Sequence, residues 1–372
     1  MNGMNLLSLA TKGVQALQAY QPGKPLEELE REYGISQAVK LASNENPLGP
    51  SPAALRVIRE QMDDLARYPD GNGFALKTAL ASKHGVTTEQ ITLGNGSNDI
   101  LELLARAFVT SENNVIFSQH AFAVYPIVTQ AVGAKAVITE ARDWGYDLDA
   151  ILAAIDNKTR LIFIANPNNP TGTWLSRQQL EQFLSRVPSE VLVVLDEAYY
   201  EYASAPAMGA SDYPSGMQWL NDYPNLVVTR TFSKAYGLAG LRIGYSVSHS
   251  EVADVLNRVR QPFNVNSLAL VAAEAALQDH EHLEKGLACN VAGMQQYTRA
   301  FTDWGLDYIP SIGNFICVKV GEAANIYELL LHEGVIVRPV ANYGMPEYLR
   351  ITIGTAQENE RCIAALQKVM SK

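Results

Sequence analysis

Short apolar runs and amphipathic stretches alternate along the chain from about Pro52 to Arg260. Apolar residues spaced by three or four positions predict helices, and short continuous β-branched runs predict buried strands. The predicted helices are 52–63, 74–84, 97–108, 176–187 and 251–260. The predicted strands are 115–118, 136–139, 161–164, 191–195 and 226–229. This alternation is typical of an α/β fold, a largely parallel sheet with helices on both faces.

The pattern changes at Ser267, where a long helix rich in Ala, Leu and Glu is predicted to reach toward Trp304. A strand, a helix, two strands and a final helix are predicted after it, which is typical of a smaller α+β domain. A chain of 372 residues exceeds what one simple core usually holds. We therefore expect an N-terminal arm that joins the small domain (1–44), a large domain (45–265) and a small C-terminal domain (266–372), with the functional site between domains.

Composition narrows the class of protein. The formal net charge of −10 and the pI near 5.2 argue against nucleic-acid binding. The cysteines, Cys289, Cys317 and Cys362, are odd in number and widely spaced, so neither a disulfide framework nor a metal site is indicated. The segment from Met1 to Leu9 lacks the features of a signal peptide, and no apolar stretch approaches membrane-spanning length. We expect a cytoplasmic protein with no nucleic-acid or membrane partner.

The segment TFSKAYGLAGLRIGY contains Lys234, which follows an apolar strand of the predicted sheet. Catalytic groups collect at such strand ends in α/β folds. A lysine amine reacts with an aldehyde only when it is deprotonated, and a desolvated pocket or a neighbouring positive charge favours that form. Thr231, Ser233 and Arg242 offer hydroxyls and a planar fork of donors that suit a phosphate. The pattern indicates a lysine for pyridoxal phosphate (PLP), although the segment alone also fits a surface lysine.

Two further strand ends carry groups that suit a pyridine ring. Asp196 follows the apolar run 191–195, and a carboxylate there can keep the ring nitrogen protonated, so that the ring accepts electrons. Tyr199 and Asn169, the latter within NPNNPTG, can hold the ring's phenolic oxygen. Taken alone, Asn169 also fits a turn asparagine that bonds its own backbone, and Asp196 fits a helix N-cap or a solvated acid.

The motifs NPNNPTG, DEAY and SKAYGLAGLRIGY occur in this order and together resemble those of the fold-type I PLP-dependent aminotransferases. Within that family the chain most resembles the histidinol-phosphate aminotransferases. This closer resemblance rests on the segments YQPGKP, LASNENPLG, RYPD, GVIVRP and LRITIG, which are spread over nearly the whole chain. It implies PLP as the cofactor. It also implies the type I fold, in which a large domain with a mostly parallel sheet flanked by helices is joined to a smaller α+β domain.

The resemblance implies a role for each matching position. Lys234 would form the Schiff base with the cofactor, and Asp196 would pair with the pyridine nitrogen. Asn169 and Tyr199 would hold the phenolic oxygen. The implied phosphate contacts are Ser233, Arg242, Thr231, Gly96, Ser97 and Asn98. The last three open a predicted helix, whose N–H groups and positive dipole end attract an anion, although a helix-capping loop without a ligand has the same pattern.

Two aromatic residues complete the implied cofactor site. Phe122 lies where the family places a ring over the pyridine face, and stacking needs only a π face. A core phenylalanine is the other interpretation of this residue. Tyr68 matches a tyrosine that reaches the cofactor phosphate of the other subunit in the family. The resemblance therefore implies a homodimer with shared active sites.

Two arginines of the predicted small domain lie in apolar strands. Arg338 ends one such strand and Arg350 lies within another, and a buried arginine needs an anionic partner. That partner is either a protein carboxylate such as Glu347 or a substrate anion. The resemblance implies that the arginines bind the phosphate of histidinol phosphate and the carboxylate of glutamate or 2-oxoglutarate in turn. Tyr20 either closes over the substrate phosphate or packs on a dimer partner.

The resemblance implies an enzyme that transfers the amino group of L-histidinol phosphate to 2-oxoglutarate. The products would be imidazole acetol phosphate and glutamate, within histidine biosynthesis. Three alternatives use the same fold: an aromatic amino acid aminotransferase, a PLP-dependent decarboxylase of a phosphorylated amino acid, and a PLP-sensing module of a transcription regulator. The acidic charge and the lack of a basic helix or of room for a DNA-binding segment before Leu41 argue against the last.

Overall fold

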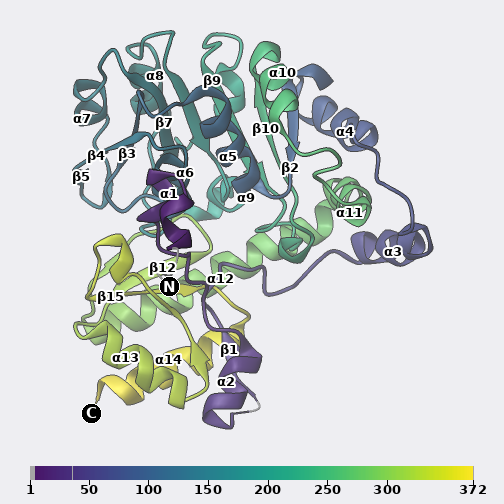
Figure 1. The fold of residues 1–372 in the computed structure, drawn as a ribbon. Helices are drawn as coiled ribbons and strands as arrows, with labels where there is room; N and C mark the ends of the chain where they lie inside the picture. Colours follow the sequence, from purple (N-terminus) through teal and green to yellow (C-terminus); the bar gives the residue numbers. More distant parts are fainter. Residues whose placement is uncertain (1–4, 36, 372) are drawn as a thin grey trace.

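The computed structural model describes residues 5–35 and 37–371. The first four residues of the segment in which we expect no signal peptide, Met1 to Leu9, lie outside the described residues. Figure 1 shows a large upper part built on one sheet and a smaller lower part that holds the C-terminus. In the described part of the chain, no helix is long and apolar enough to cross a membrane.

A seven-stranded sheet forms the centre of the large upper part, with the strand order β2-β10-β9-β8-β7-β3-β4. Only β10 is antiparallel, and it pairs with both β2 and β9. The predicted α/β fold with a mostly parallel sheet is confirmed, and β2 and β10 are strands that the apolar runs did not indicate. The strands are β2 (Ile91–Gly94), β3 (Asn114–Ser118), β4 (Lys135–Thr139), β7 (Thr159–Ala165), β8 (Leu192–Asp196), β9 (Leu226–Thr231) and β10 (Gly244–Ser248).

Helices cover both faces of this sheet because its central strands are apolar on both sides. In β7, Leu161 and Phe163 face one helix layer while Ile162 and Ile164 face the other, as the alternation of a strand requires. The first layer comprises α5 (Ser97–Phe108), α6 (Val124–Ala131) and α10 (Ser250–Val259). The second layer comprises α3 (Pro52–Gln61), α4 (Phe74–His84), α7 (Leu148–Ala153), α8 (Arg177–Leu184) and α11 (Ser267–Gln278).

The lower part contains an antiparallel sheet with the order β11-β12-β15-β14. Its strands are β11 (Tyr308–Ile309), β12 (Phe315–Lys319), β14 (Arg338–Pro339) and β15 (Tyr348–Thr352). The helices that pack against it are α12 (His280–Trp304), α13 (Ala323–His332) and α14 (Ala356–Met370). The remaining α-helices and strands are α1 (Lys12–Gln15), α2 (Leu26–Tyr33), α9 (Tyr200–Ala203), β1 (Val39–Lys40), β5 (Ala141–Arg142), β6 (Gly145–Tyr146) and β13 (Val335–Ile336).

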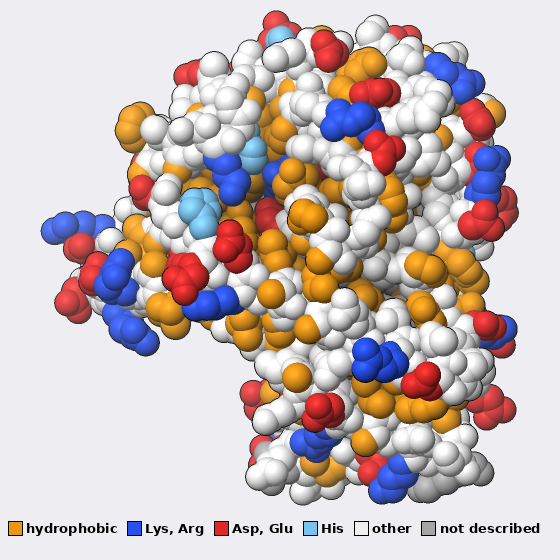
Figure 2. Space-filling model, turned by 180° about the vertical axis from the view of Figure 1, so that it is seen from behind, with side chains coloured by type: hydrophobic (Ala, Val, Ile, Leu, Met, Phe, Trp, Pro, Cys, Tyr) orange, Lys and Arg blue, Asp and Glu red, His pale blue; other side chains and the backbone are white. Residues whose placement is uncertain are grey.

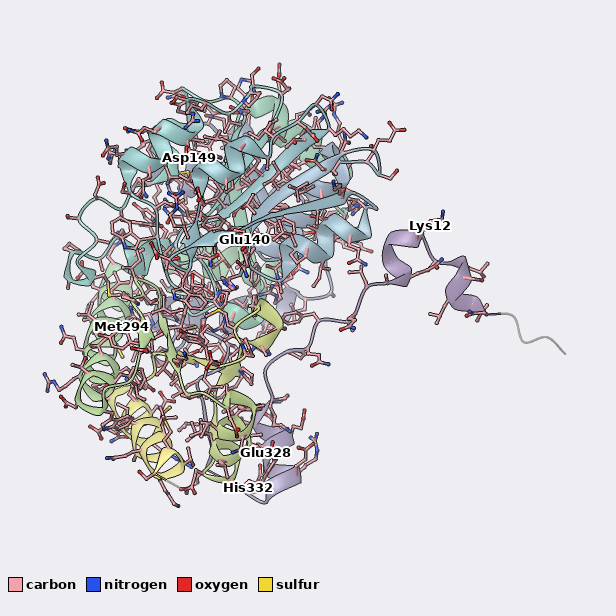
Figure 3. The ribbon with its side chains drawn as sticks, turned by 90° about the vertical axis from the view of Figure 1, so that its left-hand side faces the viewer. Lys12, Glu140, Asp149, Met294, Glu328 and His332 are labelled. Carbon is pink, nitrogen blue, oxygen red and sulfur yellow. The ribbon has the colours of Figure 1, made fainter. Side chains whose placement is uncertain are left out.

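The N-terminal segment contacts both parts of the molecule. Strand β1 pairs in parallel with β13, and Tyr33 of α2 packs edge-on against His332 of α13, with ring centroids 4.9 Å apart. Figure 3 shows α2 beside the labelled Glu328 and His332. Helix α1, which carries Lys12, lies against α6 of the large upper part, where a Cβ atom at Gly13 would lie only 2.0 Å from the carbonyl oxygen of Gln130. The proposed division of the chain at residues 44 and 265 stays a prediction.

One predicted helix is wrong in extent. The stretch from Ser267 to Trp304 forms two helices, α11 and α12, rather than one. The interruption lies at Asp279, which has non-helical dihedrals of φ −90° and ψ 70°. Its carboxylate accepts a hydrogen bond from the backbone N–H of His282 at 3.1 Å and so begins α12. A new helix therefore begins here instead of a continuation of α11.

Candidate active site

The site lies at the carboxyl ends of the central strands. Asp196 ends β8, Thr231 ends β9, and Asn169 lies in the loop that follows β7. Parallel strands end at the same edge of a sheet, so these side chains meet although they are far apart in the sequence. A cavity of about 210 Å³ opens there between this edge and the small sheet, which contributes Arg338 and Arg350.

The cavity brings together most of the positions at which we predicted site residues. Gly96 lies beside it, and Tyr68 does not line it in this chain. The predicted positions along its wall are Tyr20, Ser97, Asn98, Phe122, Asn169, Asp196, Tyr199, Thr231, Ser233, Lys234, Arg242, Arg338 and Arg350.

Lys234 lies in a tight turn after β9, where its carbonyl accepts a hydrogen bond from the N–H of Gly237 at 2.9 Å. Its Nζ donates to the carbonyl oxygen of Ser43 at 2.9 Å. Although part of the side chain faces the open cavity, burial lowers the pKa of Lys234 to about 7, and the positive charge of Arg350 lowers it further. A substantial fraction of this amine is therefore deprotonated at neutral pH and able to react with a carbonyl group.

Asp196 is buried beneath the cavity. The hydroxyl of Tyr125 donates to its Oδ2 at 2.9 Å, and the hydroxyl of Thr229 donates to its Oδ1 at 3.0 Å. Burial raises the pKa of Asp196 to about 6, and these two hydrogen bonds oppose that rise. A carboxylate in such a position is stabilised by a cationic partner, and a protonated pyridine nitrogen supplies one.

The hydroxyl oxygen of Tyr199 accepts two hydrogen bonds. One comes from Nδ2 of Asn169 at 3.1 Å and the other from Nδ2 of Asn44 at 2.9 Å. Burial raises the pKa of Tyr199 to about 12, so the phenol keeps its proton at neutral pH. Within residues 5–35 and 37–371, this proton has no acceptor, which leaves it available to a group in the cavity.

The groups around the N-terminus of α5, at the wall of the cavity, suit an anion. Helix α5 begins after Gly96, which has a φ of 83°, and no side chain caps its N-terminus. A Cβ atom at position 96 would lie 2.5 Å from Nη2 of Arg242, so only glycine allows this approach. Arg242 also donates to Oγ of Ser233 at 3.3 Å, and the N–H of Ser233 donates to Oγ1 of Thr231 at 3.1 Å. Helix N–H groups, hydroxyls and a guanidinium together suit a phosphate group.

Arg350 is only 5 % exposed. It donates to Oδ1 of Asn169 and, at 2.7 Å, to the carbonyl oxygen of Ala42. Its buried Nε has no partner in the described chain. Glu347 forms an ion pair with Lys319 at 3.3 Å, so the alternative that Glu347 holds one of the two site arginines is wrong. Arg350 thus keeps one buried donor that no described residue satisfies, and its side chain lines the cavity.

Arg338 and Tyr20 lie together at the mouth of the cavity. The guanidinium of Arg338 lies 5.7 Å from the centre of the Tyr20 ring, and its Nη2 donates to the carbonyl oxygen of Gln21 at 2.8 Å. No carboxylate of the described residues forms an ion pair with Arg338. The N-terminal segment is therefore held against the site by backbone and ring contacts.

The two predicted aromatic residues differ in position. Phe122 lines the cavity and packs edge-on against Tyr125, with ring centroids 5.9 Å apart. Tyr68 is 82 % exposed and stacks on Phe263 at 4.7 Å, away from the cavity of its own chain. Its role in the site of another subunit stays a prediction.

Sequence reasoning missed several residues of the site. Tyr125 and Thr229 hold Asp196, while Asn44 and Tyr343 line the cavity. Thr229 precedes Thr231 by two positions in β9, so strand alternation places both on one face and offered a signal. Asn44 lies within the segment LASNENPLG, but its residue type alone does not indicate its partner.

Comparisons with known proteins agree with this geometry. Residues 36–366 match the family model of aminotransferase class I and II, and the chain belongs to this class. Histidinol-phosphate aminotransferase 2 of Pseudomonas fluorescens Pf-5 is 62 % identical over 371 residues, with 99 % of each chain covered. Histidinol-phosphate aminotransferase 1 of Nitrosococcus oceani is 57 % identical, with 98 % of this chain and 97 % of the relative covered. The chain therefore belongs to the family of histidinol-phosphate aminotransferases.

Solved structures show the same fold. The histidinol-phosphate aminotransferase of Sinorhizobium meliloti, in complex with pyridoxal-5'-phosphate, has a TM-score of 0.89 and 32 % identity, with 97 % of both chains covered. An aspartate aminotransferase of Thermus thermophilus with maleate has a TM-score of 0.82 and 20 % identity, with 96 % of this chain and 99 % of that chain covered. The second similarity concerns the fold alone.

The residues of this chain fit PLP when judged from their own chemistry. The uncapped N-terminus of α5 suits the phosphate, and the lack of a side chain at Gly96 lets the guanidinium of Arg242 approach that N-terminus. The buried carboxylate of Asp196 lacks a cationic partner, and the proton of Tyr199 lacks an acceptor among the described residues. A pyridine ring that carries a phenolic oxygen, an aldehyde and a phosphate satisfies each of these groups.

Proposed function

We propose that the chain catalyses PLP-dependent transamination between L-histidinol phosphate and 2-oxoglutarate. The products are imidazole acetol phosphate and glutamate, in histidine biosynthesis. The observation that carries this proposal is the position of Lys234, an amine with a pKa of about 7 in one cavity with Asp196 and with Arg350, whose buried Nε has no described partner. The names of the relatives agree with it and do not favour an aromatic aminotransferase or a decarboxylase.

Each group of the cavity has a proposed contact with PLP. Lys234 binds the aldehyde carbon, and Asp196 pairs with the pyridine nitrogen. Tyr199 and Asn169 donate to the phenolic oxygen, and Phe122 stacks on the ring. The groups that hold the phosphate are Gly96, Ser97, Asn98, Thr231, Ser233 and Arg242. Bound PLP supplies an electron sink for the negative charge that develops on the substrate carbon next to the amine.

Lys234 also moves the proton of the reaction. Its Nζ would take the proton from the substrate carbon that bears the amine and would hold it until it is returned. The pKa of Lys234 is about 7. A base whose pKa lies near the working pH is deprotonated in a sufficient fraction of molecules and still binds a proton well enough to remove it from carbon. The carbonyl of Ser43, 2.9 Å from Nζ, orients the amine between transfers.

Arg350 and Arg338 hold the anionic end of both substrates. L-histidinol phosphate carries a phosphate, whereas glutamate and 2-oxoglutarate carry a carboxylate, and a guanidinium fork binds either group. The unpartnered Nε of Arg350 provides one donor. Tyr20, which lies over Arg338, closes the mouth of the cavity on the substrate.

We also propose a cytoplasmic homodimer whose active sites are shared. In support, Tyr68, Phe74 and Phe263 are exposed by 82 %, 71 % and 45 %, and exposed apolar rings are typical of an interface. Figure 2 shows hydrophobic side chains gathered across the middle of the face seen from behind, where the upper and lower parts meet. The three cysteines are unpaired thiols, which fits a reducing compartment.

A visible absorption spectrum of the purified chain with PLP tests this function. We expect a visible band that L-histidinol phosphate removes and 2-oxoglutarate restores. If phenylalanine or tyrosine removes the band while L-histidinol phosphate leaves it unchanged, the substrate assignment is wrong. Release of CO₂ without any need for a keto acid identifies a decarboxylase instead. Absence of a band contradicts the whole proposal.

Substitution of Lys234 tests the assignment of the base. We expect Lys234→Ala to lower kcat by about a thousandfold or more, because both the covalent contact and the proton transfer are lost. Lys285→Ala is the matched control, since Lys285 is 65 % exposed and pairs with Glu281 on the surface of α12. Steady-state turnover of Lys234→Ala near the wild-type rate contradicts the assignment.

A further inference from the structure

Asn44 lies at the centre of a hydrogen-bonded link between the cavity and the small sheet, although no prediction included it. We propose that Asn44 is a positioning residue that directs the Tyr199 proton toward the phenolic oxygen of PLP and couples this contact to β15. The inference rests on the PLP binding proposed above, but not on the identity of the substrate.

Every polar atom of Asn44 has a partner. The residue is 1 % exposed and has a φ of 55°, a left-handed conformation that asparagine tolerates better than most residues. Its N–H donates to Oγ1 of Thr352 at 2.9 Å, and its Oδ1 accepts from the same hydroxyl at 3.0 Å. Its carbonyl oxygen accepts from Nδ2 of Asn314 at 3.1 Å. The loop that carries Asn44 is thus fixed to β15 and to the residue preceding β12.

Thr352 decides which end of the Asn44 amide faces Tyr199. A threonine hydroxyl has one proton, and here its oxygen already accepts from the backbone N–H of Asn44. The proton is therefore donated to Oδ1, which turns Nδ2 of Asn44 toward the Tyr199 hydroxyl at 2.9 Å. The substitution Thr352→Val removes the hydroxyl that orients the Asn44 amide, while it keeps the shape of the side chain.

The Tyr199 oxygen then accepts from both Asn44 and Asn169, which occupies both of its lone pairs. Its own proton can be given only to a third group, and the cavity is the remaining direction. A donor to the phenolic oxygen favours the ionised form of that oxygen. Without Asn44, the Tyr199 hydroxyl can rotate, so the ionised form is less favoured.

A second role competes with this one. Asn44 can serve only to hold the left-handed turn against β15, in which case glycine would replace it without effect on the cofactor. Asn44→Gly keeps the backbone conformation and removes the amide side chain. Neither Asn44→Gly nor Thr352→Val introduces a charge, so an effect on an ionisation in the cavity cannot arise from a new charge.

The experiment is a pH titration of the visible spectrum of the PLP-loaded chain without substrate. We expect Asn44→Gly and Thr352→Val each to raise the pH midpoint of the absorption change by roughly half a unit to one unit, the equivalent of one ordinary hydrogen bond. Thr352→Ser, which keeps the hydroxyl, should leave the midpoint at the wild-type value. In a Tyr199→Phe background, the shift caused by Thr352→Val should vanish, because the two changes act through one proton.

Unchanged midpoints in both single variants overturn the proposal, and so does a shift of equal size in the Tyr199→Phe background. Failure of the proposed function has a different signature, since the unsubstituted chain would then give no visible band with PLP. A normal band that histidinol phosphate does not alter contradicts only the substrate and leaves the titration valid.

Discussion

Burial acts in opposite directions on the two ionisable groups at the centre of the cavity. It lowers the pKa of Lys234 to about 7 and raises that of Asp196 to about 6, because desolvation disfavours the charged form of each. Bound PLP would offset both desolvation penalties. Its aldehyde would react with the neutral form of Lys234, and its ring nitrogen would be a cationic partner for the Asp196 carboxylate. The site is thus prepared for a ligand that offers both groups.

The depressed pKa of Lys234 makes the stability of the cofactor-free chain depend on pH. Between the pKa of about 7 in the folded chain and the ordinary lysine pKa of 10.5, the unfolded chain binds more protons at this group, so the unfolding free energy rises with pH. We predict that Lys234→Met loses this contribution, which amounts to at most about 1.4 kcal/mol per pH unit. Urea unfolding of both chains from pH 7 to 10 measures it, and parallel curves for wild type and variant contradict the prediction.

Gly96 gives a test of the phosphate end of the site. We predict that Gly96→Ala weakens PLP affinity at least about tenfold, because the added Cβ would lie 2.5 Å from Nη2 of Arg242. Gly209→Ala is the control for an alanine at a glycine of positive φ away from the site: its φ is 78° and no atom lies within 4 Å of the added Cβ, but its ψ of 6° is less restrictive for a side chain than the ψ of 163° at Gly96. Titration of the two variants with PLP, followed by absorption, measures the affinity of each. Equal affinities contradict the proposed phosphate position.

At the scale of elements, local signals explain which helices were predictable. The predicted bounds of α4 and α5 agree with the structure, because glycines with positive φ stand at Gly73, Gly85 and Gly96. The interruption at Asp279 was missed although Asp is a preferred N-cap residue and its contact with His282 is local, because the helical pattern of Ala and Leu continues on both sides. Strand β10 lacks a long apolar run, and its pairing with β2 and β9 is a long-range property.

The capping hydrogen bond of Asp279 therefore contributes to the stability of α12. We predict that Asp279→Ala lowers the unfolding free energy by about 1 kcal/mol, because the first turn of α12 loses its side-chain acceptor. Asp222→Ala, at an exposed loop position, should change it little. Denaturant unfolding of the two variants makes the comparison, and equal losses would show that the cap has no special role.

The residues of the candidate site were likewise predictable where the sequence holds a local signal, and not where their contacts are long-range. Asp196, Thr231 and Asn169 were predictable as neighbours because each follows a strand of one parallel sheet. Asn44 and Thr352 were not, because their hydrogen bonds join positions more than 300 residues apart. A single sequence carries no signal for such a pair beyond residue type.

At the scale of the whole molecule, the cavity is assembled from both parts of the chain. The large sheet contributes Asp196, the turn after its strand β9 contributes Lys234, and the small sheet contributes Arg338 and Arg350. The segment around Asn44 lies between them and bonds to both. Relative movement of the two parts would therefore alter the anion contacts and the contacts around Tyr199 together.

Subunit mixing tests whether the site also needs a second chain. We predict that Lys234→Ala and Tyr68→Ala chains, each inactive alone, regain about a quarter of wild-type activity after random exchange, since half of the dimers then hold one intact site. The same variants assayed separately and summed are the control. No recovery, once exchange is verified with tagged chains, contradicts a shared site.

The proximity of Arg350 to Lys234 links occupancy of the cavity to protons in solution. After burial, the charge of Arg350 is the next cause of the low pKa of Lys234. An anion that binds Arg350 offsets this charge, so the lysine gains proton affinity when the anion arrives. Because linkage is reciprocal, anion binding near pH 7 is accompanied by proton uptake, and a fall in pH strengthens the binding of the anion.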